Sequence, residues 1–172
     1  MKKFTTKKLI IIAMLIAFDV IFSRVLAINV LTVKVGIGFA AIVVCAMLYG
    51  PLWSGVAAAI SDVIGAFLFP TGAYFPGFTV TAALGGVIFG LLLYKKRPGF
   101  KRAFLAALCY GVLITMFANT AMISFIADTA FWPLFVTRLV EFVVMLALQT
   151  AVITALGASD TLYGKINELK NE

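Results

Sequence analysis

The sequence predicts an all-α integral membrane protein in which residues 1–172 form one domain of six transmembrane helices. Composition is one of the two observations behind this prediction: 63% of the residues are hydrophobic, 12% are charged, and the mean hydropathy is +1.13. Soluble domains average about 45–50% apolar and about 25% charged residues, so lipid must solvate this chain. Length is the other. A helix needs about 20 mostly apolar residues to cross the hydrocarbon, and six such runs fit the chain with short loops.

The six predicted spans are, in chain order, Leu9–Leu26, Gly36–Tyr49, Leu52–Phe69, Phe78–Tyr94, Phe104–Ile126 and Trp132–Leu156. The first is predicted to be a retained span and not a signal peptide, because Asp19 interrupts the apolar run and no small-x-small cleavage site follows. The second span is short. Its approach, residues 28–35, partly alternates β-branched and polar residues, which favours an extended or re-entrant stretch over more helix.

Glycine and proline mark the breaks between the later spans. Gly50 and Pro51 end the second span and open the third, and Pro98 separates the fourth from the fifth. Pro70 and Pro76 bracket a compact aromatic loop between the third and fourth spans. The fifth and sixth spans are predicted from apolar length alone.

Basic residues predict the orientation. Eleven of the fourteen Lys and Arg residues fall on segments that six spans would place on one side: Lys2, Lys3, Lys7, Lys8, Lys95, Lys96, Arg97, Lys101, Arg102, Lys165 and Lys170. The positive-inside rule makes that side cytoplasmic, together with both termini. The net charge of +7 is thus a topology signal, and we expect no nucleic-acid partner.

Three basic residues do not fit this signal, namely Arg24, Lys34 and Arg138, and all three are expected near the outer face. An ionisable group at mid-bilayer costs about 2.5–3.5 kcal/mol and therefore marks a cavity or a partner. Helical rise brings the polar side chains together in the outer half of the bundle, below the aromatic loop. The sequence predicts an outward-facing pocket with cationic groups and aromatic walls, suited to a planar, anionic small molecule. Its candidate substrate-binding residues are Arg24, Lys34, Asp62, Phe69, Tyr74, Phe75, Phe78, Thr79, Asn119 and Arg138.

Each of these residues also has a structural explanation. Arg138 and Glu141 are i,i+3 neighbours that could neutralise each other, and Asp62 or Asp19 could pair with Arg24 in a structural bridge. The aromatic loop could be an interfacial belt, Asn119 could join helices, and Lys34 could be solvated. The small-residue pair Ala13 and Ala17, like Gly86 and Gly90, could serve close helix packing within the chain.

Several kinds of chemistry are absent from the sequence. It contains no histidine and no Walker A, GxGxxG or GxSxG motif, so we predict no metal site, no cofactor and no P-loop ATP hydrolysis. Energised transport would need a partner protein or an ion gradient. Asp19 and Asp62 could relay protons in a stand-alone carrier.

The motifs resemble a known family, the folate-type substrate-binding (S) components of energy-coupling factor (ECF) vitamin transporters. The resemblance is carried by Met47–Trp53, Ser61–Ala66, Phe69–Thr79, Ser23–Leu26 and the Ala13/Ala17 pair. It implies an S-component-like six-helix bundle in the bacterial plasma membrane that binds a vitamin, foremost folate, on the outer side. It also implies no enzyme activity of its own, because two ATPase subunits and a coupling transmembrane subunit would drive release inside.

The resemblance further implies that Ala13 and Ala17 contact the coupling subunit, and that residues 29–35, 70–78 and 127–131 cover the pocket. A pterin ring could stack on the aromatic residues and its carboxylate tail could pair with an arginine, but which residue meets which end stays open. Three alternatives stay open too: an S component for another vitamin, an autonomous proton-coupled carrier, and a small intramembrane enzyme or structural membrane protein.

Overall fold

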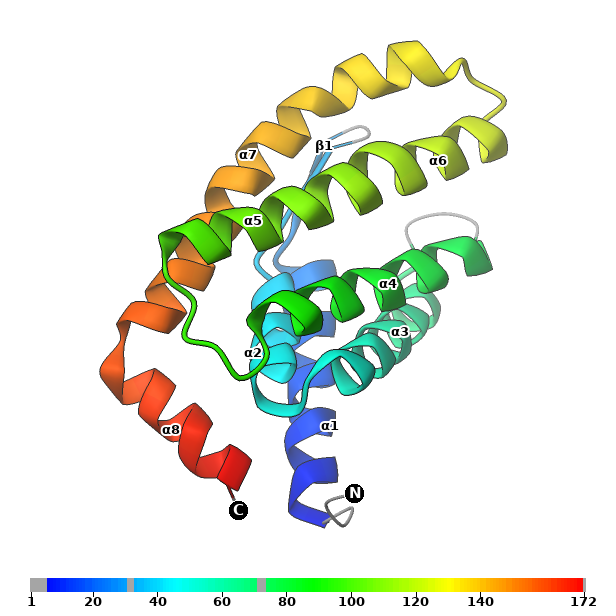
Figure 1. Ribbon diagram of the computed structural model, residues 1–172. Coiled ribbons are helices and arrows are strands. Elements are labelled where there is room, and N and C mark those ends of the chain that lie inside the picture. The colour runs from blue at the N-terminus through cyan, green and yellow to red at the C-terminus, as the bar shows by residue number, and fades with distance from the viewer. Residues whose placement is uncertain (1–5, 31–32, 71–73, 172) are drawn as a thin grey trace.

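The computed structural model describes residues 6–30, 33–70 and 74–171. Its helices are α1 (Thr6–Val20), α2 (Phe39–Tyr49), α3 (Pro51–Leu68), α4 (Pro76–Leu93), α5 (Phe100–Tyr110), α6 (Thr120–Ile126), α7 (Phe131–Ala158) and α8 (Asp160–Asn171), with π-helical segments η1 (Ile21–Val25) and η2 (Gly111–Asn119) and strands β1 (Ile28–Val30) and β2 (Val33–Val35). Figure 1 shows α3 paired with α4, and the run of α5, η2 and α6 paired with α7. α1 and α2 pack against each other and against α3.

Within the described residues, four helical runs are long and apolar enough to cross a membrane: Pro51–Leu68, Pro76–Leu93, Phe100–Ile126 and Phe131–Ala158. They cover the third to sixth predicted spans. α1 and η1 cover most of the first, and α2, with 11 residues, covers most of the second. The prediction of a helical, membrane-embedded protein is therefore confirmed, whereas the number of crossings and the side of the termini stay predictions.

The approach to α2 is extended, which agrees with the extended one of the two conformations, extended or re-entrant, expected for residues 28–35. β1 and β2 form an antiparallel hairpin in which Ile28 lies opposite Val35 and Asn29 opposite Lys34. β-branched residues suit a pleated strand better than a helix, which explains why the helix does not continue here. The all-α fold class stands, with one short hairpin beside the helices.

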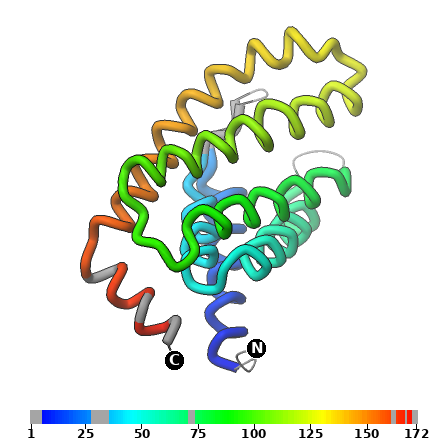
Figure 2. Tube along the Cα trace, viewed as in Figure 1, coloured from blue at the N-terminus to red at the C-terminus, as the bar shows by residue number. Residues whose placement is uncertain are grey.

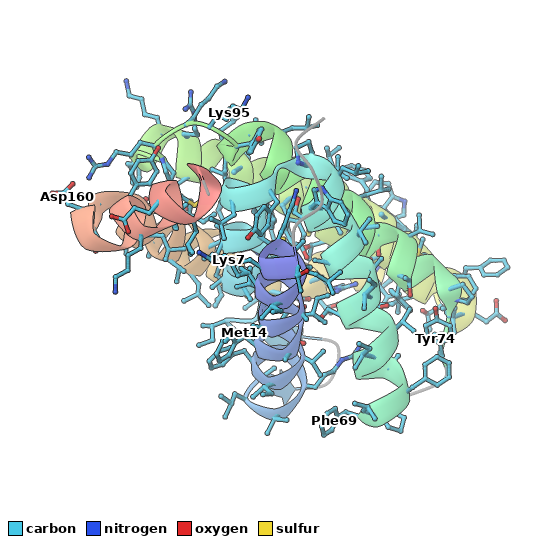
Figure 3. All side chains as sticks on the ribbon, turned by 90° about the horizontal axis from the view of Figure 1, so that it is seen from below. Lys7, Met14, Phe69, Tyr74, Lys95 and Asp160 are labelled. Carbon is cyan, nitrogen blue, oxygen red and sulfur yellow. The ribbon has the colours of Figure 1, made fainter. Side chains whose placement is uncertain are left out.

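The bundle has two ends, which we name by what they carry. The terminal end holds the start of α1, the loop between α4 and α5, and α8; the loop end holds the β-hairpin and the α3–α4 and α6–α7 connections (Figure 1). The Cα trace in Figure 2 shows the start of α1 and α8 at this same end of the molecule. In Figure 3, which views the molecule from below, Lys95 and Asp160 lie at the upper left of the molecule, and Phe69 and Tyr74 lie at the lower right.

Glycine lets α3 and α4 approach closely. A Cβ atom at Gly86 would clash with the backbone of Ser54, and one at Gly90 would clash with Pro51. The Ser54 hydroxyl lies 2.8 Å from the Gly86 carbonyl across this contact and 2.9 Å from the Gly50 carbonyl at the start of its own helix, so its one proton can be donated to either. The Gly86-x-x-x-Gly90 spacing therefore serves packing within the chain, as the structural explanation predicted.

The terminal end is closed by an apolar core. Buried side chains of α2, α4, α5 and α7 form it, and Ile166 of α8 packs into it from the C-terminal side. The α4–α5 loop holds the corner between α7 and α8, because Arg97 Nε donates to the Gly157 carbonyl at 2.8 Å and its Nη2 lies 2.5 Å from Asp160 Oδ1. α8 is an element that sequence analysis did not predict.

Candidate functional site

A cavity of about 580 Å³ lies inside the bundle, between the two helical hairpins. Every helix except α8 contributes to its lining, together with both π-helical segments and the chain around Gly36 and Gly38. It is continuous from the aromatic residues Tyr74 and Phe75 near the loop end to Phe89 and Gln149 further in. A cavity of this size falls within the range of about 300–1,000 Å³ that is typical of small-molecule sites.

Arg24 and Asp62 form the first polar group of the lining. Arg24 Nη2 lies 3.2 Å from Asp62 Oδ1, and the two side chains are 13% and 20% exposed. Thr79 Oγ1 donates to Asp62 Oδ2 at 2.8 Å, and the Tyr74 hydroxyl lies 2.9 Å from Thr79 Oγ1. The chain of contacts thus links α1, α3, α4 and the loop before α4.

Gly65 explains how this group is assembled. A Cβ atom there would lie 2.7 Å from Arg24 Nε, so only glycine leaves the space in which the guanidinium crosses α3. Arg24 itself comes from η1, the π-helical end of α1. Such π turns shift the side chains that follow them and are frequent at functional sites. Close by, the Ser61 hydroxyl donates a hydrogen bond to Asp19, which also lines the cavity.

Arg138 and Glu141 form the second polar group, on α7. Arg138 Nε lies 3.1 Å from Glu141 Oε2, and both residues are buried. Of the two terminal nitrogens, Arg138 Nη2 also lies 3.1 Å from Glu141 Oε2. Arg138 Nη1 is buried and has no hydrogen-bond partner in the described part of the chain. The pair therefore neutralises itself, as the structural explanation had it, and still leaves one guanidinium N–H₂ group available to the cavity.

Aromatic rings wall the cavity at both depths. Tyr74, Phe75 and Phe78 line it near the loop end, and the rings of Phe75 and Phe78 meet edge to face with centroids 6.1 Å apart. Deeper, Phe89 and Tyr110 stack with ring centroids 4.9 Å apart and an interplanar angle of 19°. Sequence analysis did not select this deeper pair, because Phe and Tyr inside apolar runs carry no distinguishing pattern.

Asn119 lies at the end of η2 and lines the cavity, with its Oδ1 accepting a hydrogen bond from Thr81 Oγ1 at 2.8 Å. This contact joins η2 to α4, which fits the interhelical alternative for Asn119, while its amide nitrogen keeps its donors. Gln149 is a further polar lining residue that sequence analysis missed. It is 1% exposed, and its Oε1 atom has no hydrogen-bond partner among the described residues.

Some predicted residues lie outside the lining. Thr79 donates a hydrogen bond to Asp62 but does not itself line the cavity. Phe69, which follows α3, is 41% exposed and does not line the cavity either. The side chain of Lys34 falls outside the described residues. Ala13 and Ala17 are exposed on α1, whereas the residues just before them, Ile12 and Ile16, are buried.

The described lining contains acidic residues beside the cationic groups expected from the sequence. It contains the acidic residues Asp19, Asp62 and Glu141 and the basic residues Arg24 and Arg138. Both arginines have a carboxylate within salt-bridge distance. The cavity therefore offers hydrogen-bond acceptors as well as cationic donors, and no group of three potential metal ligands occurs within the part of the chain described.

The fold and the cavity define a membrane-embedded helical protein with an internal polar site for a small molecule. Residues 7–161 match the family described as ECF transporter, substrate-specific component, and the chain belongs to that family. The family consists of transporter components and not of enzymes.

The relatives and a solved structure agree with this membership. The chain is 39% identical over 145 residues to the folate transporter FolT of Clostridium novyi (strain NT), covering 84% of each chain. It is 31% identical over 156 residues to FolT of Leuconostoc mesenteroides subsp. mesenteroides, covering 87% of this chain and 84% of the relative. A crystal structure of FolT bound with folic acid superposes with a TM-score of 0.84 at 34% identity, over 89% of this chain and 93% of the other.

Proposed function

We propose that this protein is the folate-binding S component of an ECF importer in the bacterial plasma membrane. The observation that carries the proposal is the cavity of about 580 Å³, walled by aromatic rings and lined by both arginines and carboxylates. The likeness to relatives named as folate transporters, and to a FolT structure with folic acid, supports folate over other vitamins.

The chemistry of the lining suits the two ends of folate. The flat pterin ring can stack on aromatic side chains, and its N–H groups can donate to carboxylate or amide oxygens. The carboxylates of the glutamate tail can accept hydrogen bonds from guanidinium groups, most strongly in a bidentate arrangement. We assign Arg24, Asp62, Tyr74, Phe75, Phe78, Asn119 and Arg138 to substrate contact, Thr79 to support of Asp62, and Phe69 to the rim of the site. Lys34 stays a proposed contact whose side chain lies outside the described residues.

The wider assembly is part of the proposal. The single domain would cross the membrane six times with both termini in the cytoplasm, capture folate at the loop end, and release it inside. Two ATPase subunits and a coupling transmembrane subunit would supply the energy. The exposed Ala13 and Ala17 would give this coupling subunit a smooth contact face on α1.

A proton-coupled carrier that works alone has less support. It would need carboxylates free to exchange protons, whereas Asp62 accepts hydrogen bonds from Arg24 and Thr79, and Asp19 accepts one from Ser61.

Isothermal titration of folic acid into detergent-purified protein tests the proposal, with thiamine and riboflavin as controls. We expect tight binding of folic acid near one to one, without ATP, and no heat from the two control vitamins. Absence of heat with folic acid and its reduced forms would overturn the assignment of folate.

A further inference from the structure

The deeper part of the cavity contains a polar side chain that the bundle leaves unsatisfied. Gln149 lines the cavity, is 1% exposed, and its Oε1 atom has no hydrogen-bond partner among the described residues. Buried polar atoms are almost always hydrogen-bonded, and a buried acceptor without a donor destabilises the fold. An apolar residue at position 149 would avoid that cost, so the amide is best explained by a contact that the isolated chain does not supply.

Position along α7 separates Gln149 from the charged residues of the site. Arg138 and Glu141 lie nearer the loop end, and Gln149 lies about 16 Å further along the helix than Arg138. Met145 is the lining residue between them. The polar groups that α7 presents to the cavity therefore change from charged near the loop end to a neutral amide further in.

The surroundings of the deeper region are aromatic. Phe89 is 1% exposed and stacks on Tyr110, with ring centroids 4.9 Å apart, and both line the cavity. Each of these residues is nearer the terminal end of its helical run than the loop end. The deeper region thus combines flat apolar walls with one amide, which suits an uncharged ring and not a pair of carboxylates.

We infer that Gln149 is a specificity-determining residue of the deep subsite, where its amide hydrogen-bonds the edge of an uncharged heteroaromatic ring that carries an N–H donor beside a carbonyl acceptor. This inference rests on the proposed function, because the pterin ring of folate has such an edge. An amide side chain is complementary to it, since the carbonyl accepts and the N–H₂ group donates. The carboxylate tail of the ligand then extends towards Arg138 and Arg24, where the unpartnered Nη1 of Arg138 can donate to it.

The test compares two ligands with the same ring edge, folic acid and pteroic acid, of which only the first has a glutamate tail. Gln149→Met preserves side-chain length and removes both hydrogen-bonding groups. We expect it to weaken both ligands by about tenfold or more and by the same factor, because a site built around a hydrogen bond loses it for either ligand. Thr154→Val is the matched control on the same helix, since the Thr154 hydroxyl donates to the Thr150 carbonyl (2.7 Å) and the residue does not line the cavity.

Each outcome of the titration decides the matter. Wild-type affinity for both ligands in Gln149→Met would overturn the inference and leave folate binding intact, and a loss confined to folic acid would overturn it by placing Gln149 at the tail. Failure of the unaltered protein to bind either ligand would overturn the proposed function and the inference together. Without ligand, Gln149→Met should unfold in detergent at a thermal midpoint equal to or above that of the unaltered protein, because it removes the unsatisfied acceptor. If Gln149→Met does not fold, Gln149→Leu is used in its place.

Discussion

The buried pair Arg138 and Glu141 offers a test that separates structural pairing from ligand contact. The guanidinium contacts Glu141 Oε2 through Nε and Nη2, both at 3.1 Å, while Nη1 is left without a partner in the described chain. Arg138→Met alone would mix two effects, because it removes a ligand donor and also takes the cation away from a buried carboxylate. The double variant Arg138→Met with Glu141→Gln removes both charges and so isolates the ligand contact.

The two single variants should lose stability and the double variant should regain most of it. Removing one partner of a buried ion pair costs about 3–5 kcal/mol, whereas removing both is often close to neutral. For a chain of this size each kcal/mol shifts the thermal midpoint by about 2–4 °C, so the single variants should melt at least about 6 °C lower. Affinity should behave differently. A charge-assisted hydrogen bond is worth about 1.5–3 kcal/mol, which corresponds to folic acid binding that is about 10- to 150-fold weaker in Arg138→Met and in the double variant alike.

Thermal unfolding in detergent and isothermal titration with folic acid measure the two quantities on the same preparations. Glu141→Gln serves as the control for affinity, because it keeps Arg138 and frees its guanidinium, and it should bind folic acid at least as tightly as the unaltered protein. A double variant that is stable and binds folic acid like the unaltered protein would refute the reasoning and assign Arg138 a structural role only.

Two further predictions concern other faces of the molecule. Ala17→Trp should prevent assembly with the coupling and ATPase subunits in a pull-down while leaving folic acid affinity unchanged. The control variant Leu91→Trp, on the exposed face of α4, should assemble normally. Loss of folic acid binding in Ala17→Trp would show that the alanine face packs internally. Gly65→Ala should weaken the binding of folic acid by about tenfold, because the new Cβ would lie 2.7 Å from Arg24 Nε. The control Gly164→Ala adds the same methyl group where nothing lies within 4 Å and should leave the affinity unchanged. Equal affinities in the two variants would exclude Arg24 from the site.

The fold could be predicted from the sequence wherever a long apolar run ends in glycine or proline. α3 and α4 begin at Pro51 and Pro76, where a missing N–H group costs nothing at the first helical turn, so their bounds follow almost directly. The hairpin before α2 was predictable only as an alternative, since short apolar runs fit helix and strand equally well. α8 was missed because its polar sequence carries no membrane signal; its anchoring depends on Ile166 packing against other helices.

The site was predictable where a charge stands out in an apolar run, and not elsewhere. Arg24, Asp62 and Arg138 are visible because an ionisable group at membrane depth needs a reason. Gln149 is neutral and was overlooked, although its spacing from Arg138, Glu141 and Met145 places all four on one face of α7, a helical periodicity that could have indicated it. The net charge of the pocket lining could not be derived from the sequence, because it depends on which carboxylates face the cavity together with the arginines.

The pairing of both arginines has a consequence for how affinity and specificity are divided in this site. Arg24 and Arg138 already contact Asp62 and Glu141, so a ligand carboxylate must share a neutralised guanidinium and gains less than it would from a free one. Strong binding would then come mainly from stacking a flat ring between aromatic side chains, an interaction that does not distinguish one flat ligand from another. Under the proposed function, discrimination among flat ligands would depend on the polar atoms left unsatisfied in the described chain, Arg138 Nη1 and Gln149 Oε1, because a ligand without the matching group leaves them buried and unpaired.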